Sequence, residues 1–201
     1  MNILLIRTSN RALSISNKLA DKVLQTCQET AHTVPNVQIL NVYDLPHIDK
    51  DYAESLRSRH DNDDANSASL LLSDALIQQL VSADVVIIAT PMHNFTVPSC
   101  LKAWIDHVVR IGKTFTATPE GKIGTLIDRP VYIAVSAGGL LDGRQPDFLQ
   151  NYLQTIFETI GINSLKFFVI QGSVMGENHL EQEWLSIKQK IDAHFHQNKS
   201  L

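Results

Sequence analysis

Residues 2–27 read NILLIRTSNRALSISNKLADKVLQTC. The run 3–6 is apolar throughout, which is typical of a strand that is buried on both faces of a parallel sheet. Leu19, Val23 and Cys27 then recur four positions apart, as on one face of a helix. The polar segment 8–16 joins the two patterns. A buried strand, a loop and an amphipathic helix in this order predict the opening unit of an α/β sheet.

The same alternation continues to the end of the chain. Apolar runs predict strands at 85–89, 131–135 and 167–170, and a mixed run predicts an edge strand at 37–42. Helical stripes follow at 70–80, 101–108, 149–160 and 184–195, with Gly112 and Gly161 as helix stops. We therefore predict one α/β domain over residues 1–201. Its five-stranded parallel sheet takes the doubly wound order 2-1-3-4-5, with helices on both faces. Residues 46–66 are expected to form a solvated loop and 113–126 a short hairpin.

Composition excludes several classes of protein. The 201 residues carry a net charge of −4 without a basic cluster, so no nucleic-acid partner is expected. No apolar run approaches the roughly 20 residues of a membrane span, and the first residues lack the features of a signal peptide. Cys27 and Cys100 are isolated in sequence, which predicts buried, reduced thiols and a cytoplasmic location.

No metal site is predicted either. The acidic run 60–64 lacks the glycine and the closing glutamate of a calcium-binding loop. His194 and His196 stand two residues apart on the last helix, so their side chains do not share a face.

The loop after the first strand has the composition of an anion site. In sheets of this order, ligands bind beyond the carboxyl ends of the strands, between the first and third. Residues 8–16 open a helix, whose first N–H groups are free to bind an anion. Hydroxyl groups at Ser9, Ser14 and Ser16 add donors. The glycines of a dinucleotide or P-loop motif are missing. A simpler interpretation is that Ser14 or Ser16 only caps the helix.

Two further loops reach the same edge of the predicted sheet. The second contains Met92, His93, Asn94 and Phe95, where Met and Phe offer apolar contact to a flat ring and Asn offers hydrogen bonds. The third contains Ser136, Ala137, Gly138 and Gly139, where paired glycines let a ligand approach the backbone. Each segment alone is also compatible with an ordinary turn. Together the loops favour a ligand with a phosphate at one end and a planar ring at the other, such as FMN.

In order and position, these three motifs resemble those of the FMN-dependent NADH-azoreductase / NADH:quinone oxidoreductase family, and the likeness extends over nearly the whole chain. The resemblance implies a flavodoxin-like fold, a homodimer, one FMN per subunit, and NADH or NADPH as donor. It implies reduction of quinones and aromatic azo compounds. We further predict ping-pong hydride transfer through the flavin, with no side chain acting as an essential acid or base, because the cofactor performs the hydride chemistry. The residues that the resemblance places against FMN are Ser9, Ser14, Ile15, Ser16, Met92, His93, Asn94, Phe95, Ser136, Ala137, Gly138 and Gly139.

The chain departs from the family pattern at three positions. Members often carry an aromatic residue where His93 stands, Arg where Ala137 stands, and Tyr where Ala117 stands. These changes affect the expected acceptor pocket more than the FMN pocket.

Three other functions compete with this interpretation. A flavodoxin-type electron carrier is usually more acidic than this chain. A hydrolase needs a metal cluster or an activated nucleophile. A receiver domain needs acidic residues after the first strand, where Arg7, Thr8 and Ser9 stand.

Overall fold

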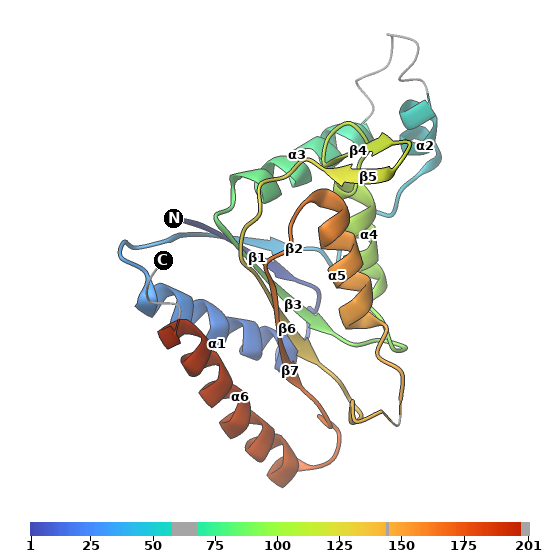
Figure 1. Ribbon diagram of the computed structural model, residues 1–201. Coiled ribbons are helices and arrows are strands. Elements are labelled where there is room, and N and C mark those ends of the chain that lie inside the picture. The colour runs from blue at the N-terminus through green and yellow to red at the C-terminus, as the bar shows by residue number, and fades with distance from the viewer. Residues whose placement is uncertain (58–67, 144, 198–201) are drawn as a thin grey trace.

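A parallel sheet forms the centre of the molecule (Figure 1). The computed structural model describes residues 1–57, 68–143 and 145–197. The strands run in the order β2-β1-β3-β6-β7. Their bounds are β1 (Asn2–Arg7), β2 (Asn36–Asn41), β3 (Val85–Pro91), β6 (Val131–Ser136) and β7 (Leu165–Ile170). This is the predicted doubly wound order 2-1-3-4-5, which is confirmed. All neighbouring strands pair in parallel, also as predicted.

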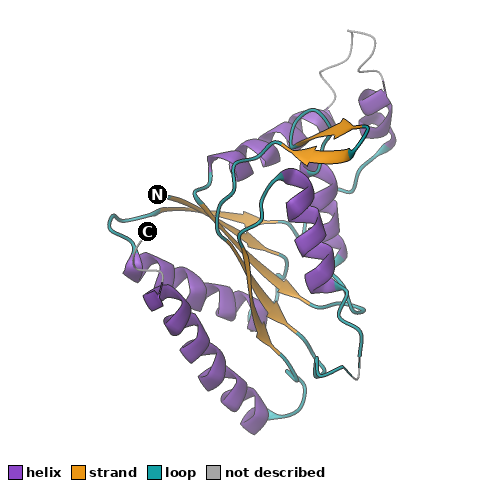
Figure 2. Ribbon diagram, in the orientation of Figure 1, coloured by secondary structure: helices purple, strands orange, loops and turns teal. Residues whose placement is uncertain are grey.

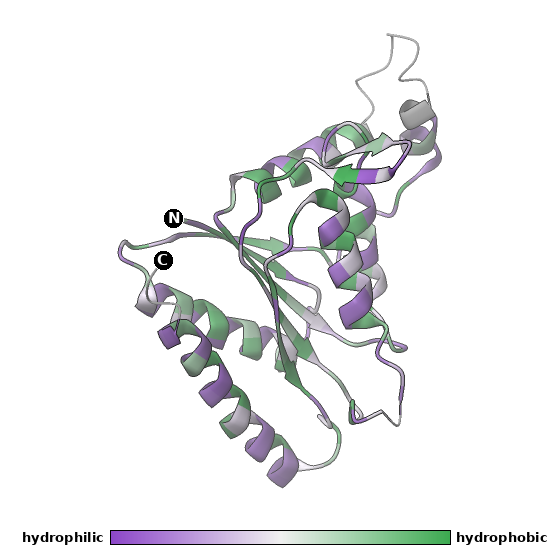
Figure 3. Ribbon diagram, in the orientation of Figure 1, coloured by the Kyte–Doolittle hydropathy of each residue, from purple (hydrophilic) through white to green (hydrophobic). Residues whose placement is uncertain are grey.

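Helices cover both faces of this sheet (Figures 1 and 2). On one face lie α1 (Ile15–Thr30) and α6 (Glu177–Gln197), and on the other lie α3 (Ala68–Ser82), α4 (Ser99–Val108) and α5 (Leu149–Ile160). Successive strand residues point to opposite faces, so Ile3 and Leu5 pack with α1 while Leu4 and Ile6 pack with α4 and α5. Figure 3 shows the mainly apolar strands between helices that carry polar residues on their outer sides.

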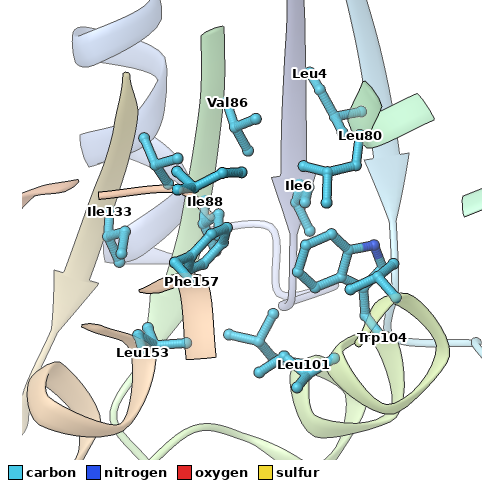
Figure 4. Packing of buried hydrophobic residues seen from close by; sticks show 14 of the residues in the cluster. Leu4, Ile6, Leu80, Val86, Ile88, Leu101, Trp104, Ile133, Leu153 and Phe157 are labelled. Atoms are coloured by element: carbon cyan, nitrogen blue, oxygen red, sulfur yellow. The ribbon is translucent and has the colours of Figure 1, made fainter. Parts of the chain in front are cut away.

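The largest side chain of the core belongs to α4. Trp104 is 1% exposed and packs beside Phe157 of α5, with a ring-centroid distance of 6.4 Å. Figure 4 shows both rings among aliphatic residues of β1, β3 and β6. This cluster fixes α4 and α5 on the sheet and so sets where the loops after β3 and β6 end.

The segment between β2 and α3 differs in part from its prediction. A solvated loop was expected at 46–66, but α2 (Lys50–Arg57) forms there. Tyr52 anchors this helix, since it is 2% exposed and its hydroxyl donates to the Asp106 carbonyl at 3.3 Å. The helix was missed because its eight residues are too few to show an apolar periodicity in the sequence. The acidic run 60–64 lies outside the described residues.

The other local predictions agree with the structure in most respects. The hairpin expected at 113–126 consists of β4 (Phe115–Thr118) and β5 (Gly121–Gly124). Gly161 ends α5 in the left-handed conformation, with φ of 97°. Gly112 also has a positive φ, but α4 has already ended at Val108.

A buried cation joins α3 to the segment after α4. Arg110 is 2% exposed, and its guanidinium donates to the hydroxyl of Ser73 at 2.7 Å and to the carboxylate of Asp74. Lys113 Nζ lies 3.1 Å from the same Asp74 carboxylate, on the solvent side of the cluster. The helices of this face are therefore linked by charge as well as by apolar packing.

Candidate functional site

The carboxyl ends of β1, β3 and β6 open onto one cleft of about 350 Å³. This lies at the low end of the range of about 300–1,000 Å³ that is usual for small-molecule sites. The cleft is where the sequence predicted it, at the reversal of strand order between β1 and β3. The predicted residues that line it are Ser9, Ser14, Ile15, Met92, His93, Ser136 and Gly138. The predicted residues outside its lining are Ser16, Asn94, Phe95, Ala137 and Gly139.

The loop before α1 is held in place by its own polar groups. Ser14 is the N-cap, and its Oγ accepts a hydrogen bond from the Asn17 backbone N–H at 3.3 Å. The side-chain amide of Asn17 donates to the Ser9 carbonyl at 2.9 Å. Among the described residues, the N–H groups of Ile15 and Ser16 meet no acceptor, and the first turn of α1 has no acidic residue. The start of this helix therefore has the donors and the dipole of an anion site.

Ser16 lies at this helix start, but its side chain does not reach the cleft. The residue is 0% exposed, and its Oγ lies 3.1 Å from the Ser14 Oγ. Only the backbone N–H of Ser16 remains for a ligand, whereas Ser14 is among the residues that line the cleft. Capping and ligand contact are therefore compatible roles for Ser14.

Replacing these two serines should separate the two roles. We expect Ser14→Ala to weaken FMN binding about tenfold or more, because a hydrogen bond to a charged group contributes roughly 1.5–3 kcal/mol. Riboflavin binding should change little, since riboflavin has no phosphate. We expect Ser16→Ala to change both affinities less than threefold (about 0.65 kcal/mol). Fluorescence titration of the flavin-free variants measures this, and a larger FMN loss in Ser16→Ala than in Ser14→Ala would contradict the assignment.

The loop after β3 is a tight turn. His93 and Thr96 exchange backbone hydrogen bonds of 2.9 and 3.0 Å, which leaves Asn94 and Phe95 at the tip. Both tip residues have positive φ, 49° and 68°, a region that asparagine adopts more readily than phenylalanine. The turn directs Met92 and His93 to the cleft, and it leaves Asn94 and Phe95 exposed at its rim.

The loop after β6 presents only alternate residues to the cleft. Ser136 and Gly138 line it, while Ala137 is fully buried and its N–H donates to Ile170 at 2.8 Å. A Cβ on Gly139 would lie 2.8 Å from the Gln145 side chain, so the glycine lets Gln145 pack closely against the backbone. The Gly138 N–H has no acceptor among the described residues and is free for a ligand.

Sequence reasoning missed several lining residues. They are Thr8, Asn10, Arg11, Leu13, Pro91 and Ser173. Arg11 stands inside the quoted first loop, where only backbone N–H groups and side-chain hydroxyl groups were considered as donors. Ser173 comes from the loop after β7, and its N–H donates to the Ala137 carbonyl at 3.0 Å. The signal that was available for Ser173 is Gly172, a glycine two residues after the end of β7, which has φ of 62°.

The donors around this cleft fit FMN. One end offers the free amides at the start of α1, the Ser14 hydroxyl and Arg11, and no carboxylate lines the cleft in the described part of the chain. The other end offers the apolar surface of Pro91 and Met92 and the free N–H of Gly138. A phosphate suits the first end, and a flat ring with hydrogen-bonding edges suits the second.

The described residues show neither a metal site nor a membrane span. No three metal-ligating side chains gather in them, and none of their helices combines the length and apolar character needed to cross a bilayer. Both cysteines are unpaired. Cys27 is buried, as predicted, and burial raises the pKa of its thiol to about 11. Cys100 is only half-buried, and its Sγ–H donates to the Thr8 carbonyl at 3.3 Å.

The fold and the site define a flavodoxin-like protein with a cleft at the reversal of strand order, where one end offers donors suited to an anion. A family model described as "Flavodoxin-like fold" matches residues 1–195. The FMN-dependent NADH:quinone oxidoreductase 4 of Pseudomonas fluorescens is 41% identical over 184 residues, which cover 88% of this chain and 86% of the relative. The FMN-dependent NADH:quinone oxidoreductase of Pseudoalteromonas atlantica is 33% identical over 177 residues, which cover 88% of each chain. The chain belongs to this family of flavodoxin-like oxidoreductases.

Solved structures agree with the fold. An azoreductase from Bacillus anthracis superimposes with a TM-score of 0.87 at 23% identity, covering 98% of this chain and 99% of that one. An FMN-dependent NADH-azoreductase from the same species, solved with FMN, gives a TM-score of 0.83 at 22% identity, with coverage of 96% and 98%.

Proposed function

We propose that the protein binds FMN and uses NADH to reduce quinones and aromatic azo compounds. The cleft carries this proposal, because its anion-binding end and its apolar end match the two ends of FMN. When bound, FMN supplies the hydride chemistry, and the protein supplies binding, orientation and electrostatics. Relatives named as NADH:quinone oxidoreductases favour an enzyme over an electron carrier without its own substrate.

We assign a role to each side of the cleft. The amides of Ile15 and Ser16 and the hydroxyl of Ser14 hold the phosphate. Met92 contacts the ring, and the Gly138 N–H donates to its acceptor edge, where a preorganised donor stabilises negative charge. Asn94, Phe95, Ala137 and Gly139 shape the loops behind these contacts.

A visible spectrum and a kinetic assay test the proposed function. The purified protein should be yellow, and mass spectrometry should identify the released cofactor as FMN. Steady-state NADH oxidation at several quinone concentrations should give parallel double-reciprocal lines, as expected when donor and acceptor occupy one cleft in turn. A colourless protein that FMN does not reconstitute would overturn the proposal. Intersecting lines would overturn only the ping-pong order.

His93 is the one histidine among the described lining residues, and histidine is the side chain that most often serves as a general acid in enzymes. We nevertheless expect no essential role for it, since it is exposed at an open cleft where water supplies protons. His93→Phe should keep the rate of quinone reduction within about an order of magnitude of wild type, whereas losing a general acid typically costs about 10²–10⁴-fold. Stopped-flow reoxidation of the reduced protein at several pH values measures this. A loss of 10²-fold or more with FMN still bound would assign the acid to His93.

We further propose a homodimer in the cytoplasm. Phe95 and Phe148 are 43% and 60% exposed, and the Phe148 N–H donates to the Phe95 carbonyl at 3.0 Å, so the two residues form an apolar rim beside the cleft. A second copy would remove this surface from water. The sequence also suggests a partner face made of Phe148, Tyr152 and Phe157, but Phe157 is fully buried in the core and cannot contribute to it. Sedimentation of the FMN-bound protein tests the dimer, and a fully active monomer at micromolar concentration would contradict it.

A further inference from the structure

The cleft has one permanently charged side chain among its described lining residues, and it stands outside the motif positions. Arg11 lines the cleft beside Ser9 and Ser14. No ion pair to Arg11 is found in the described part of the chain, in contrast to Arg7, whose guanidinium lies 2.6 Å from Asp21. The positive charge of Arg11 is therefore not neutralised by the protein.

The backbone of Arg11 is fixed although its side chain is exposed. Its N–H donates to the Ser9 Oγ at 3.3 Å, and its carbonyl accepts a hydrogen bond from the Ser14 N–H at 3.1 Å. These two bonds place Arg11 directly before the first turn of α1, where the free amides of Ile15 and Ser16 lie. A guanidinium at this place is close enough to form charge-assisted hydrogen bonds with an anion bound at the helix start.

Neutral donors alone leave the charge of a phosphate uncompensated. The Ser14 hydroxyl is shared with the Asn17 N–H and with Ser16, and the Ser16 side chain is buried away from the cleft. The helix dipole contributes only a partial positive charge. Among the described lining residues, Arg11 is the one that can place a full positive charge beside a dianionic phosphate.

We propose that Arg11 is the residue that makes this cleft select a phosphorylated flavin over an unphosphorylated one, through its charge. The proposal rests on the proposed FMN site and adds the residue that determines its specificity. Because Arg11 is exposed, its contribution should decrease as salt screens it.

Binding of FMN and riboflavin to the flavin-free protein tests this role without any measurement of turnover. At low salt, Arg11→Gln should weaken FMN binding about tenfold, which corresponds to about 1.4 kcal/mol, and should leave riboflavin binding within twofold. Arg11→Lys keeps the charge and should recover most of the FMN affinity. At 1 M salt, where the screening length is about 3 Å, the wild type and Arg11→Gln should differ less than threefold.

Lys18→Gln is the matched control. Lys18 is an exposed cation on α1, the helix that follows the Arg11 loop, but it lines the groove between α1 and α6 instead of the cleft. This variant removes the same charge and should leave FMN binding within twofold of wild type.

The outcomes separate the two proposals. If the wild type binds no FMN, the proposed function fails. If the wild type binds FMN and Arg11→Gln binds it equally well, the function stands and the role of Arg11 is overturned. Equal losses of FMN and riboflavin in Arg11→Gln would also overturn it, because they would show a change in loop shape.

Discussion

Replacing Trp104 with alanine should lower the free energy of unfolding by about 3–5 kcal/mol, the usual cost of deleting a large aromatic side chain from a core. Trp104 is 1% exposed and lies between α4 and the sheet, beside Phe157 of α5 (Figure 4). Its loss leaves a cavity where α4 rests on the sheet, and neighbouring side chains can fill this only in part. Urea unfolding followed by far-ultraviolet circular dichroism measures the change.

Trp104→Phe is the informative control for this position. The indole N–H of Trp104 is buried and has no acceptor among the described residues. Phenylalanine keeps much of the ring and removes this unsatisfied donor, which itself costs about 1–3 kcal/mol. We expect Trp104→Phe to lose less than about 1.5 kcal/mol. A loss as large as that of Trp104→Ala would show that the indole N–H has a partner after all.

Replacing Asp74 with alanine should have the second largest effect, a loss of about 3 kcal/mol. Arg110 would then keep its charge at 2% exposure, with Ser73 and the Leu70 carbonyl as its remaining partners. Breaking a buried ion pair costs about 3–5 kcal/mol, and we take the lower end because Asp74 is partly open to water. Lys113→Gln is the control, since its exposed contact with Asp74 contributes at most about 1 kcal/mol. Equal losses in both variants would contradict the assignment.

The contribution of Asp74 should also depend on pH. Burial raises the pKa of Asp74, but hydrogen bonding to Lys113 and the charge of Arg110 outweigh this and hold the pKa below its usual value. A lowered folded-state pKa stabilises the protein above the unfolded pKa of about 3.9, and this stability is lost as pH falls through the folded value. The stability difference between wild type and Asp74→Asn should therefore be constant from pH 7 to 5 and shrink below pH 4. Unfolding curves at these pH values test the direction.

The sheet was predictable from sequence because its signal is local. Runs such as 85–89 are apolar at every position, which is typical of a strand whose two faces are both covered by helices. The tip of the second loop was less predictable. His93 and Thr96 close a turn with positive φ at Phe95, an unusual conformation for a phenylalanine that propensity does not reveal.

Which residue of a motif faces the ligand also depends on packing between distant segments. Ala137 is buried and its N–H donates to the Ile170 carbonyl, while Gly139 packs against the Gln145 side chain, so neither lines the cleft. The sequence pattern located both loops correctly but treated every position in them as equivalent. Arg11 was passed over because one exposed arginine in a loop is an ordinary surface residue until a cleft is seen beside it.

The order of the strands also determines when the cleft can exist during synthesis. β1 lies inside the sheet, but its neighbour β3 comes much later in the chain, since Ile3 of β1 pairs with Val85 of β3. In the same way, Val131 of β6 pairs with Leu165 of β7. Such distant pairings slow folding, since a long loop must close before any contact rewards it. The first loop therefore leaves the ribosome long before the segments that complete its binding surface. Until β3 follows, one edge of the apolar β1 has no strand to pair with, and unpaired strand edges of this kind favour aggregation of the growing chain.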